Sequence, residues 1–146
     1  MGTRRQGREA ALKLLYACEM TRAQAEEVLS DRWVESIVPS DSQEFVQGLV
    51  TGVVQHREEI DGLIQSCSEH WSLERIGVVE RNILRLAIYE LLFVPDIPPN
   101  VSINEAVEVA KHYGAQDAWL FINGILDRIK HEAMSQPDVA GMLQRS

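Results

Sequence analysis

Histidine and cysteine side chains are the first candidates for chemistry, because both bind metals and act in catalysis. The four histidines are dispersed, and none stands in an HExxH or Glu-x-x-His pattern. Cys18 and Cys67 lie far apart without a CxxC motif, as expected of small apolar side chains in a reducing compartment. P-loop, GxGxxG and nucleophile-elbow motifs are also missing from the sequence. The sequence therefore predicts a protein that is not an enzyme and holds no metal or cofactor.

Arginine side chains at the start of the chain indicate a different chemistry, which is phosphate binding. Arg4, Arg5 and Arg8 fall within about one and a half helical turns, and Lys13 extends the basic strip. The planar guanidinium can donate two parallel hydrogen bonds to a phosphate. From the residues alone, a phosphate-binding start and a solvated helix terminus both stay open.

Residues 117–131 place aromatic, basic and amide side chains on one expected helix. Phe121, Gly124 and Arg128 follow one another at i, i+3 and i+7, with Asn123 and Asp127 beside them. Glycine costs about 1 kcal/mol relative to alanine inside a helix, so some group should approach closely at Gly124. A neighbouring helix and a nucleic acid are both candidates. Aromatic rings beside arginine stack on unpaired bases, as in single-stranded RNA recognition.

Two other patterns are interpreted as structural. Arg81 and Arg85 share one face of the most apolar helical segment and are expected to form its solvent stripe, with long stems covering apolar neighbours. Gly48 and Gly52, at i and i+4, are expected to let two helices approach closely.

Helices must position all of these side chains, because apolar residues recur at three- and four-residue spacing between the prolines. Thr21-x-x-Gln24 and Ser102-x-x-Glu105 fit capping boxes, and Gly114 suits a left-handed C-terminal cap. The predicted helices span 4–20, 22–36, 42–56, 58–68, 76–94, 103–113 and 117–134.

The expected architecture is all-α, because the sequence carries no strand or hairpin pattern. Short connections favour one compact bundle of about seven helices. It should form a single domain over 1–136, with a loosely ordered tail over 137–146.

Charge is unevenly distributed along the 146 residues, whose net charge is -8. Residues 1–20 hold four basic and two acidic side chains, whereas 21–80 hold four basic and twelve acidic ones. The acidic total argues against a protein that coats nucleic acid, but the start is locally basic. No apolar run approaches the length of a membrane span, and the N-terminus lacks a signal-peptide core. A cytoplasmic protein with no membrane partner is expected.

The chain resembles the NusB family of transcription antitermination proteins over about residues 4–131. The resemblance rests on four segments in the same order and spacing: the arginine-rich start followed by Leu15-Tyr16, ERNILRLAIYEL over 80–91, VSINEAVEVAKHYG over 101–114 and FINGILDR over 121–128.

The resemblance implies a helical RNA-binding factor built from two packed three-helix halves. Members of the family bind the single-stranded boxA element of ribosomal RNA transcripts together with the ribosomal protein NusE. They act on the RNA polymerase elongation complex with other Nus factors. Carried over by position, the RNA-binding residues would be Arg4, Arg5, Arg8, Phe121, Asn123, Asp127 and Arg128. Tyr16 and Glu80 would face NusE.

Three segments depart from the family pattern. Gln6-Gly7 replaces what is often a more basic and helix-favouring pair, so a less ordered start with weaker RNA binding is expected. Trp119-Leu120 stands where polar or basic residues are common and adds apolar contact area. Residues 21–41 carry no distinctive match.

Two alternatives stay open beside antitermination. A similar helical module precedes the catalytic domain of some ribosomal RNA cytosine methyltransferases, so the chain could be a detached module. It could also be a self-associating structural protein in which Trp33, Trp71 or Trp119 builds a homodimer interface. Light scattering with and without RNA would test the dimer, because RNA should dissociate it.

Overall fold

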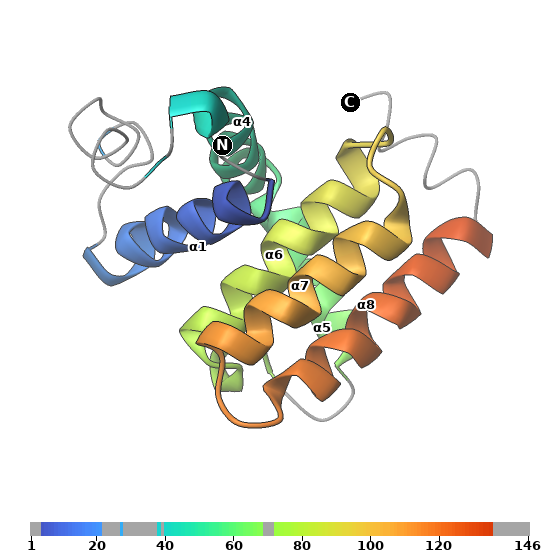
Figure 1. The fold of residues 1–146 in the computed structure, drawn as a ribbon. Helices are drawn as coiled ribbons and strands as arrows, with labels where there is room; N and C mark the ends of the chain where they lie inside the picture. Colours follow the sequence, from blue (N-terminus) through green and yellow to red (C-terminus); the bar gives the residue numbers. More distant parts are fainter. Residues whose placement is uncertain (1–3, 22–26, 28–37, 39, 69–71, 136–146) are drawn as a thin grey trace. The chain divides into compact units, whose positions relative to one another are not determined.

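The computed structural model describes residues 4–21, 27, 38, 40–68 and 72–135, and helices dominate this part of the chain (Figure 1). The all-α prediction is confirmed. The described residues contain six α-helices, and the predicted helix over 22–36 and the tail over 137–146 lie outside them, apart from Glu27. The helices are α1 Arg4–Thr21, α4 Gln43–Gln55, α5 Arg57–Cys67, α6 Val78–Phe93, α7 Pro99–Tyr113 and α8 Ala118–Ser135, with short 3-10 turns η1 Ser40–Ser42 and η2 Leu73–Arg75. None of the described helices is long and apolar enough to cross a membrane.

The first compact unit spans Met1–His56 and contains α1 packed against α4. Apolar side chains at helical spacing on both helices are removed from water, including Leu12 and Leu15 of α1 and Val46, Leu49 and Val53 of α4. Each fully buried aliphatic side chain contributes about 1.5–3 kcal/mol relative to an exposed one. The packing of α1 on α4 therefore fixes the helix that carries the arginine-rich start.

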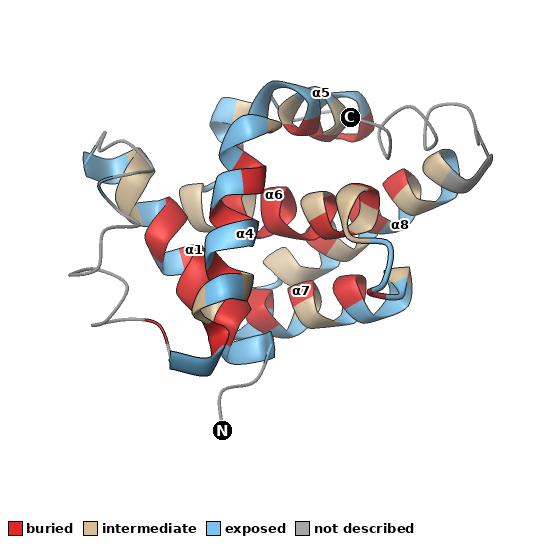
Figure 2. Ribbon diagram, turned by 90° about the horizontal axis from the view of Figure 1, so that it is seen from above, coloured by how far each residue is buried: buried red, intermediate tan, exposed pale blue. Residues whose placement is uncertain are grey.

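The second compact unit spans Arg57–Ser146 and is organised around α6, which packs against α5, α7 and α8. Residues 82–88 of α6 are buried without interruption, which Figure 2 shows as a continuous red stretch. The core side chains include Ile83, Leu84, Ile88, Ile60, Ile64, Ile103, Ile122, Leu126 and Ile129. The expectation of a central 76–94 helix is confirmed, and α8 presents its other face to solvent.

The predicted solvent stripe on α6 is wrong for Arg85, which is only 3% exposed. Its guanidinium donates from Nε to Asp61 Oδ1 at 2.8 Å and from Nη2 to Asp61 Oδ2 at 3.1 Å. Nη1 donates to Asn82 Oδ1 at 3.1 Å. Arg81 is half-buried and bonds the carbonyl of Ile76 at 2.8 Å. A bidentate carboxylate from α5 thus allows a charged group to enter the core.

The predicted capping box at Ser102 is also wrong, because α7 begins three residues earlier at Pro99. Proline suits the first helical position, where its missing N–H is not needed. Ser102 is buried inside the helix, and its hydroxyl donates to Glu90 Oε1 at 2.9 Å. Thr21 is the last residue of α1, and its hydroxyl donates to the carbonyl of Ala17 at 2.5 Å. Gln24, the other member of the capping box predicted there, lies outside the described residues.

Two glycines differ from their predicted roles. Gly114 does end α7, but its φ is -84°, which is not the left-handed conformation expected of it. Gly48 is exposed, and a Cβ added there would meet nothing within 4 Å, so it allows no close helix contact among the described residues.

Candidate nucleic-acid interface

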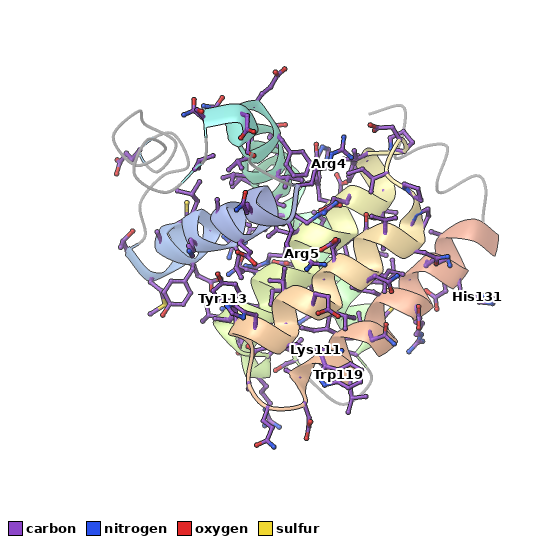
Figure 3. The ribbon with its side chains drawn as sticks, in the orientation of Figure 1. Arg4, Arg5, Lys111, Tyr113, Trp119 and His131 are labelled. Carbon is purple, nitrogen blue, oxygen red and sulfur yellow. The ribbon has the colours of Figure 1, made fainter. Side chains whose placement is uncertain are left out.

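The first turn of α1 presents two of the three predicted arginines to solvent. Arg4 and Arg5 are exposed (Figure 3), whereas Arg8 is only 5% exposed. The guanidinium carbons of Arg4 and Arg8 lie 5.4 Å and 5.7 Å from the centre of the Phe45 ring, in cation–π geometry. Arg4 and Arg5 are therefore accessible to a phosphate, and burial against α4 leaves Arg8 chiefly a packing role.

Gly7 explains how Phe45 reaches this position. It is buried, and a Cβ on it would lie 2.9 Å from Phe45 Cδ2. The glycine that departs from the family pattern thus makes room for the ring. The expectation of a less ordered start is wrong from Arg4 onward, because α1 is helical from that residue. Phe45 was missed from sequence, since nothing in its local pattern shows that it meets α1.

The predicted α8 residues lie along one helix with graded exposure. Asp127 is exposed, whereas Phe121, Asn123 and Arg128 are half-buried. Asn123 Nδ2 lies 3.5 Å from Asp127 Oδ2, which places a donor and an acceptor side by side at the surface. The exposed fraction of Leu120 is 56%, so this face also offers apolar area.

Gly124 is exposed in the middle of α8, and a Cβ added there would meet nothing within 4 Å. The neighbouring-helix explanation for this glycine is therefore wrong for the part of the chain that the structure describes. A glycine leaves the helix backbone open to close approach by a ligand.

Arg128 also has contacts within the protein. Its Nε lies 3.2 Å from Glu132 Oε1, and its Nη1 donates to the carbonyl of Cys67 at 3.4 Å. Burial raises the pKa of the Cys67 thiol, and the charge of Glu132 adds to the increase, although the Ser66 hydroxyl and Arg128 oppose it. The thiol is therefore protonated at neutral pH, as expected of a structural cysteine. Arg128 joins α8 to the end of α5.

Trp119 and Leu120, which depart from the family pattern, begin α8. Lys111 Nζ lies 4.7 Å from the centre of the Trp119 ring, and Figure 3 shows the two side chains together between α7 and α8. The pair combines a cation with an aromatic surface, the two features that recur where proteins bind single-stranded nucleic acid.

The two predicted partner residues lie in different units. Tyr16 on α1 is 41% exposed, and Met20, one turn later, is 56% exposed. Together they give α1 an apolar surface of the kind that protein partners cover. Glu80 on α6 is half-buried, and its Oε1 accepts the backbone N–H of Ala115 at 2.8 Å. The carboxylate of Glu80 is thus engaged within its own unit.

Metal binding receives no support from the described residues, among which no group of three or more histidine, cysteine, aspartate or glutamate side chains could hold an ion. Two candidate surfaces therefore result, which are a basic helix start in the first unit and a mixed polar and apolar face of α8 in the second. Both suit the recognition of a polymer better than catalysis on a small molecule.

Comparison with known proteins agrees with this interpretation. The NusB family model matches residues 5–131. The chain is 47% identical to the transcription antitermination protein NusB of Myxococcus xanthus, over 88% of this chain and 95% of that protein. It is 48% identical to the NusB of Geobacter sulfurreducens, over 94% of this chain and 99% of the relative.

Solved structures give the same result. NusB from T. maritima superposes with a TM-score of 0.82 and 42% identity, covering 90% of this chain and 92% of that one. A crystal structure of the antitermination factors NusB and NusE in complex with dsRNA matches with a TM-score of 0.78 and 33% identity. The match covers 88% of this chain and 96% of that one. Helix arrangement, sequence and length agree along most of the chain, which therefore belongs to the NusB family.

Proposed function

We propose that this chain is a transcription antitermination factor that binds boxA RNA together with NusE and acts on the RNA polymerase elongation complex with other Nus factors. One observation carries the proposal: a NusB-family chain presents exposed Arg4 and Arg5 and an open, mixed face on α8. A relative with 33% identity has been solved as NusB and NusE with dsRNA. The protein would act in the cytoplasm, where transcripts emerge, and without catalysing a reaction.

The residue types support a division of labour on the RNA. Arg4 and Arg5 would bind phosphates, because their guanidinium groups are exposed on the first turn of α1. Phe121 would stack on a base, and Asn123 and Asp127 would bond base edges. Unpaired bases expose both faces and edges, which favours single-stranded boxA RNA as the ligand of this chain.

Two predicted residues take other or shared roles in the proposal, and Tyr16 keeps its predicted role. Arg8 supports the RNA-binding turn by packing on Phe45. The side chain of Arg128 is 40% exposed beside Glu132, and Arg128 would contact RNA through this exposed part. Tyr16 would contact NusE through the exposed side of α1. Acidic residues concentrated in 21–80 would attract a basic ribosomal protein and raise its association rate.

The relatives favour antitermination over the methyltransferase alternative. The similarity to this chain extends over 95% of the NusB protein of Myxococcus xanthus and 99% of that of Geobacter sulfurreducens. Their similarity therefore concerns a whole antitermination protein and not a module within a larger enzyme. Homodimer formation is compatible with the proposal and would be measured separately by light scattering.

Transcription in vitro tests the proposal directly. A template with boxA upstream of a terminator is transcribed by RNA polymerase with NusE and the other Nus factors, with and without this protein. Readthrough should rise when the protein is added and should not rise on a template whose boxA is scrambled. Equal readthrough with and without the protein on the boxA template would contradict the proposal.

Replacing Arg5 with alanine should weaken RNA binding and reduce its dependence on salt. One fewer phosphate contact releases fewer counterions, so the slope of log K against log salt should become shallower by about 1. Fluorescence anisotropy with labelled boxA RNA between low and moderate salt measures this slope. Arg75→Ala, which removes an exposed arginine from η2, serves as the matched control and should leave the slope unchanged. An unchanged slope for Arg5→Ala would remove Arg5 from the interface.

A further inference from the structure

Glu80 occupies a narrow space at the start of α6. The helix begins after Gly77, and the Glu80 carboxylate folds back so closely that a Cβ on Gly77 would collide with its Oε2. Glu80 Oε1 then accepts the N–H of Ala115, in the connection between α7 and α8, at 2.8 Å. One carboxylate therefore joins the beginning of α6 to a loop that lies 35 residues later in the sequence.

Gly114 ends α7 one residue before Ala115. A Cβ there would lie 2.8 Å from the Ala110 carbonyl oxygen, so the space that this glycine leaves is required by α7 itself, whereas 3.5 Å to Glu80 Oε1 is ordinary contact. Since the φ of Gly114 is -84°, a conformation open to other residues, the requirement is for space and not for unusual backbone geometry. Gly77, Glu80 and the Ala115 N–H thus form a single arrangement, which we name the Glu80 clip.

The clip holds the segment that starts α8. After Ala115, the chain turns through a bond from Ala118 N–H to the Ala115 carbonyl at 3.0 Å. Asp117 adopts the left-handed backbone conformation, with a φ of 66°, which is uncommon for residues other than glycine. Trp119 and Phe121 lie in the next turn. An anchor on Ala115 therefore constrains the direction in which α8 presents its first aromatic residues.

We propose that Glu80 is a positioning residue for the RNA surface, which fixes the start of α8 through Ala115. This role rests on the proposed RNA-binding function, and it differs from the partner contact that the family resemblance implies for Glu80. A glutamine side chain at position 80 can accept a hydrogen bond from the same N–H through its amide oxygen, but it is neutral and cannot form an ion pair with a partner. Charge and hydrogen-bond acceptance can therefore be separated experimentally.

The test compares Glu80→Gln and Glu80→Ala with the unmodified chain. Affinity for a boxA oligonucleotide without NusE should fall about fivefold to tenfold for Glu80→Ala and should stay within twofold for Glu80→Gln. The Ala115 amide should lose protection from hydrogen exchange in Glu80→Ala and keep it in Glu80→Gln. Thermal unfolding followed by circular dichroism shows that each variant is folded.

Two results would overturn the clip. In one, Glu80→Gln loses NusE binding while Glu80→Ala keeps its RNA affinity, which would make Glu80 a charged partner contact. In the other, Ala115 exchanges equally in all variants, which would mean that the carboxylate does not anchor the loop. If the unmodified chain failed to bind boxA RNA, the proposed function would fail, whereas the exchange measurement would still test the anchor. If Glu80→Ala does not fold, the hydrogen-exchange comparison of Glu80→Gln with the unmodified chain still tests the anchor, because loss of protection at Ala115 in Glu80→Gln would overturn it.

Discussion

Replacing Asp61 with alanine is expected to lower the free energy of unfolding by about 3–5 kcal/mol. Asp61 faces the guanidinium of Arg85, which is 3% exposed, through two hydrogen bonds of 2.8 Å and 3.1 Å. The substitution removes the carboxylate but leaves the charged group inside the protein, where the hydrogen bond to Asn82 remains but the two bonds to Asp61 no longer offset its desolvation. Because domains are stabilised by only about 5–15 kcal/mol, this is a large fraction of the total. Urea unfolding followed by circular dichroism measures the change.

Arg57→Ala is the matched control for this substitution. Arg57 lies 3.7 Å from the same carboxylate, but its side chain is 53% exposed, so the pair should contribute less than about 1 kcal/mol. Replacing Asp61 and Arg85 together with apolar residues of similar volume should restore much of the loss, since no charge is then left in the core. A loss below about 1 kcal/mol for Asp61→Ala would show that the ion pair does not stabilise the second unit.

Replacing Gly124 with alanine is expected to raise stability by about 1 kcal/mol and to weaken RNA binding about tenfold. The stability should rise because alanine favours the helix and because a Cβ at this position meets nothing within 4 Å. Binding should fall because the same methyl group occupies the open backbone between Leu120 and Asp127, both of which are exposed. Thermal unfolding and anisotropy with boxA RNA measure the two effects on the same sample.

The chain contains two controls for Gly124. Gly48 in α4 and Gly62 in α5 are also exposed helical glycines, with no atom within 4 Å of an added Cβ. Gly48→Ala and Gly62→Ala should raise stability by a similar amount without changing RNA affinity. A purely structural role for Gly124 would give the same result for all three variants. That outcome would remove the exposed face of α8 from the proposed RNA surface.

The helices of this fold are readable from the sequence because their signal is local. Apolar residues at helical spacing predict α1, α4, α5, α6 and α8 to within about two residues at most ends. The start of α7 is misplaced because Ser102 carries a capping pattern but bonds Glu90 on another helix. Arg85 is assigned to the surface because its counter-charge lies 24 residues away on α5. Both errors concern partners that spacing along one helix does not identify.

The site residues divide in the same way. Asn123 and Asp127 are four residues apart on one helix, so their spacing alone brings them together, whereas Phe121 and Asn123, two residues apart, point in different directions. The burial of Arg8 depends on Phe45 in another helix, and the anchoring of Ala115 depends on Glu80. Gly114 and Gly77 are visible in the sequence only as glycines at helix ends. The room that Gly77 leaves for the Glu80 carboxylate, and the bond that Ala115 donates to it, become evident only when these two separate segments are placed together.

Sequence-selective RNA binding in the presence of NusE tests the central claim most directly. A gel-shift or anisotropy competition compares boxA RNA with a scrambled RNA of the same composition, with the protein and NusE mixed at fixed concentrations. Scrambling preserves the phosphate charge, so any difference reports recognition of bases and not electrostatic attraction. BoxA RNA should compete at a concentration at least about tenfold lower than the scrambled RNA does. Equal competition by the two RNAs would contradict the proposed function.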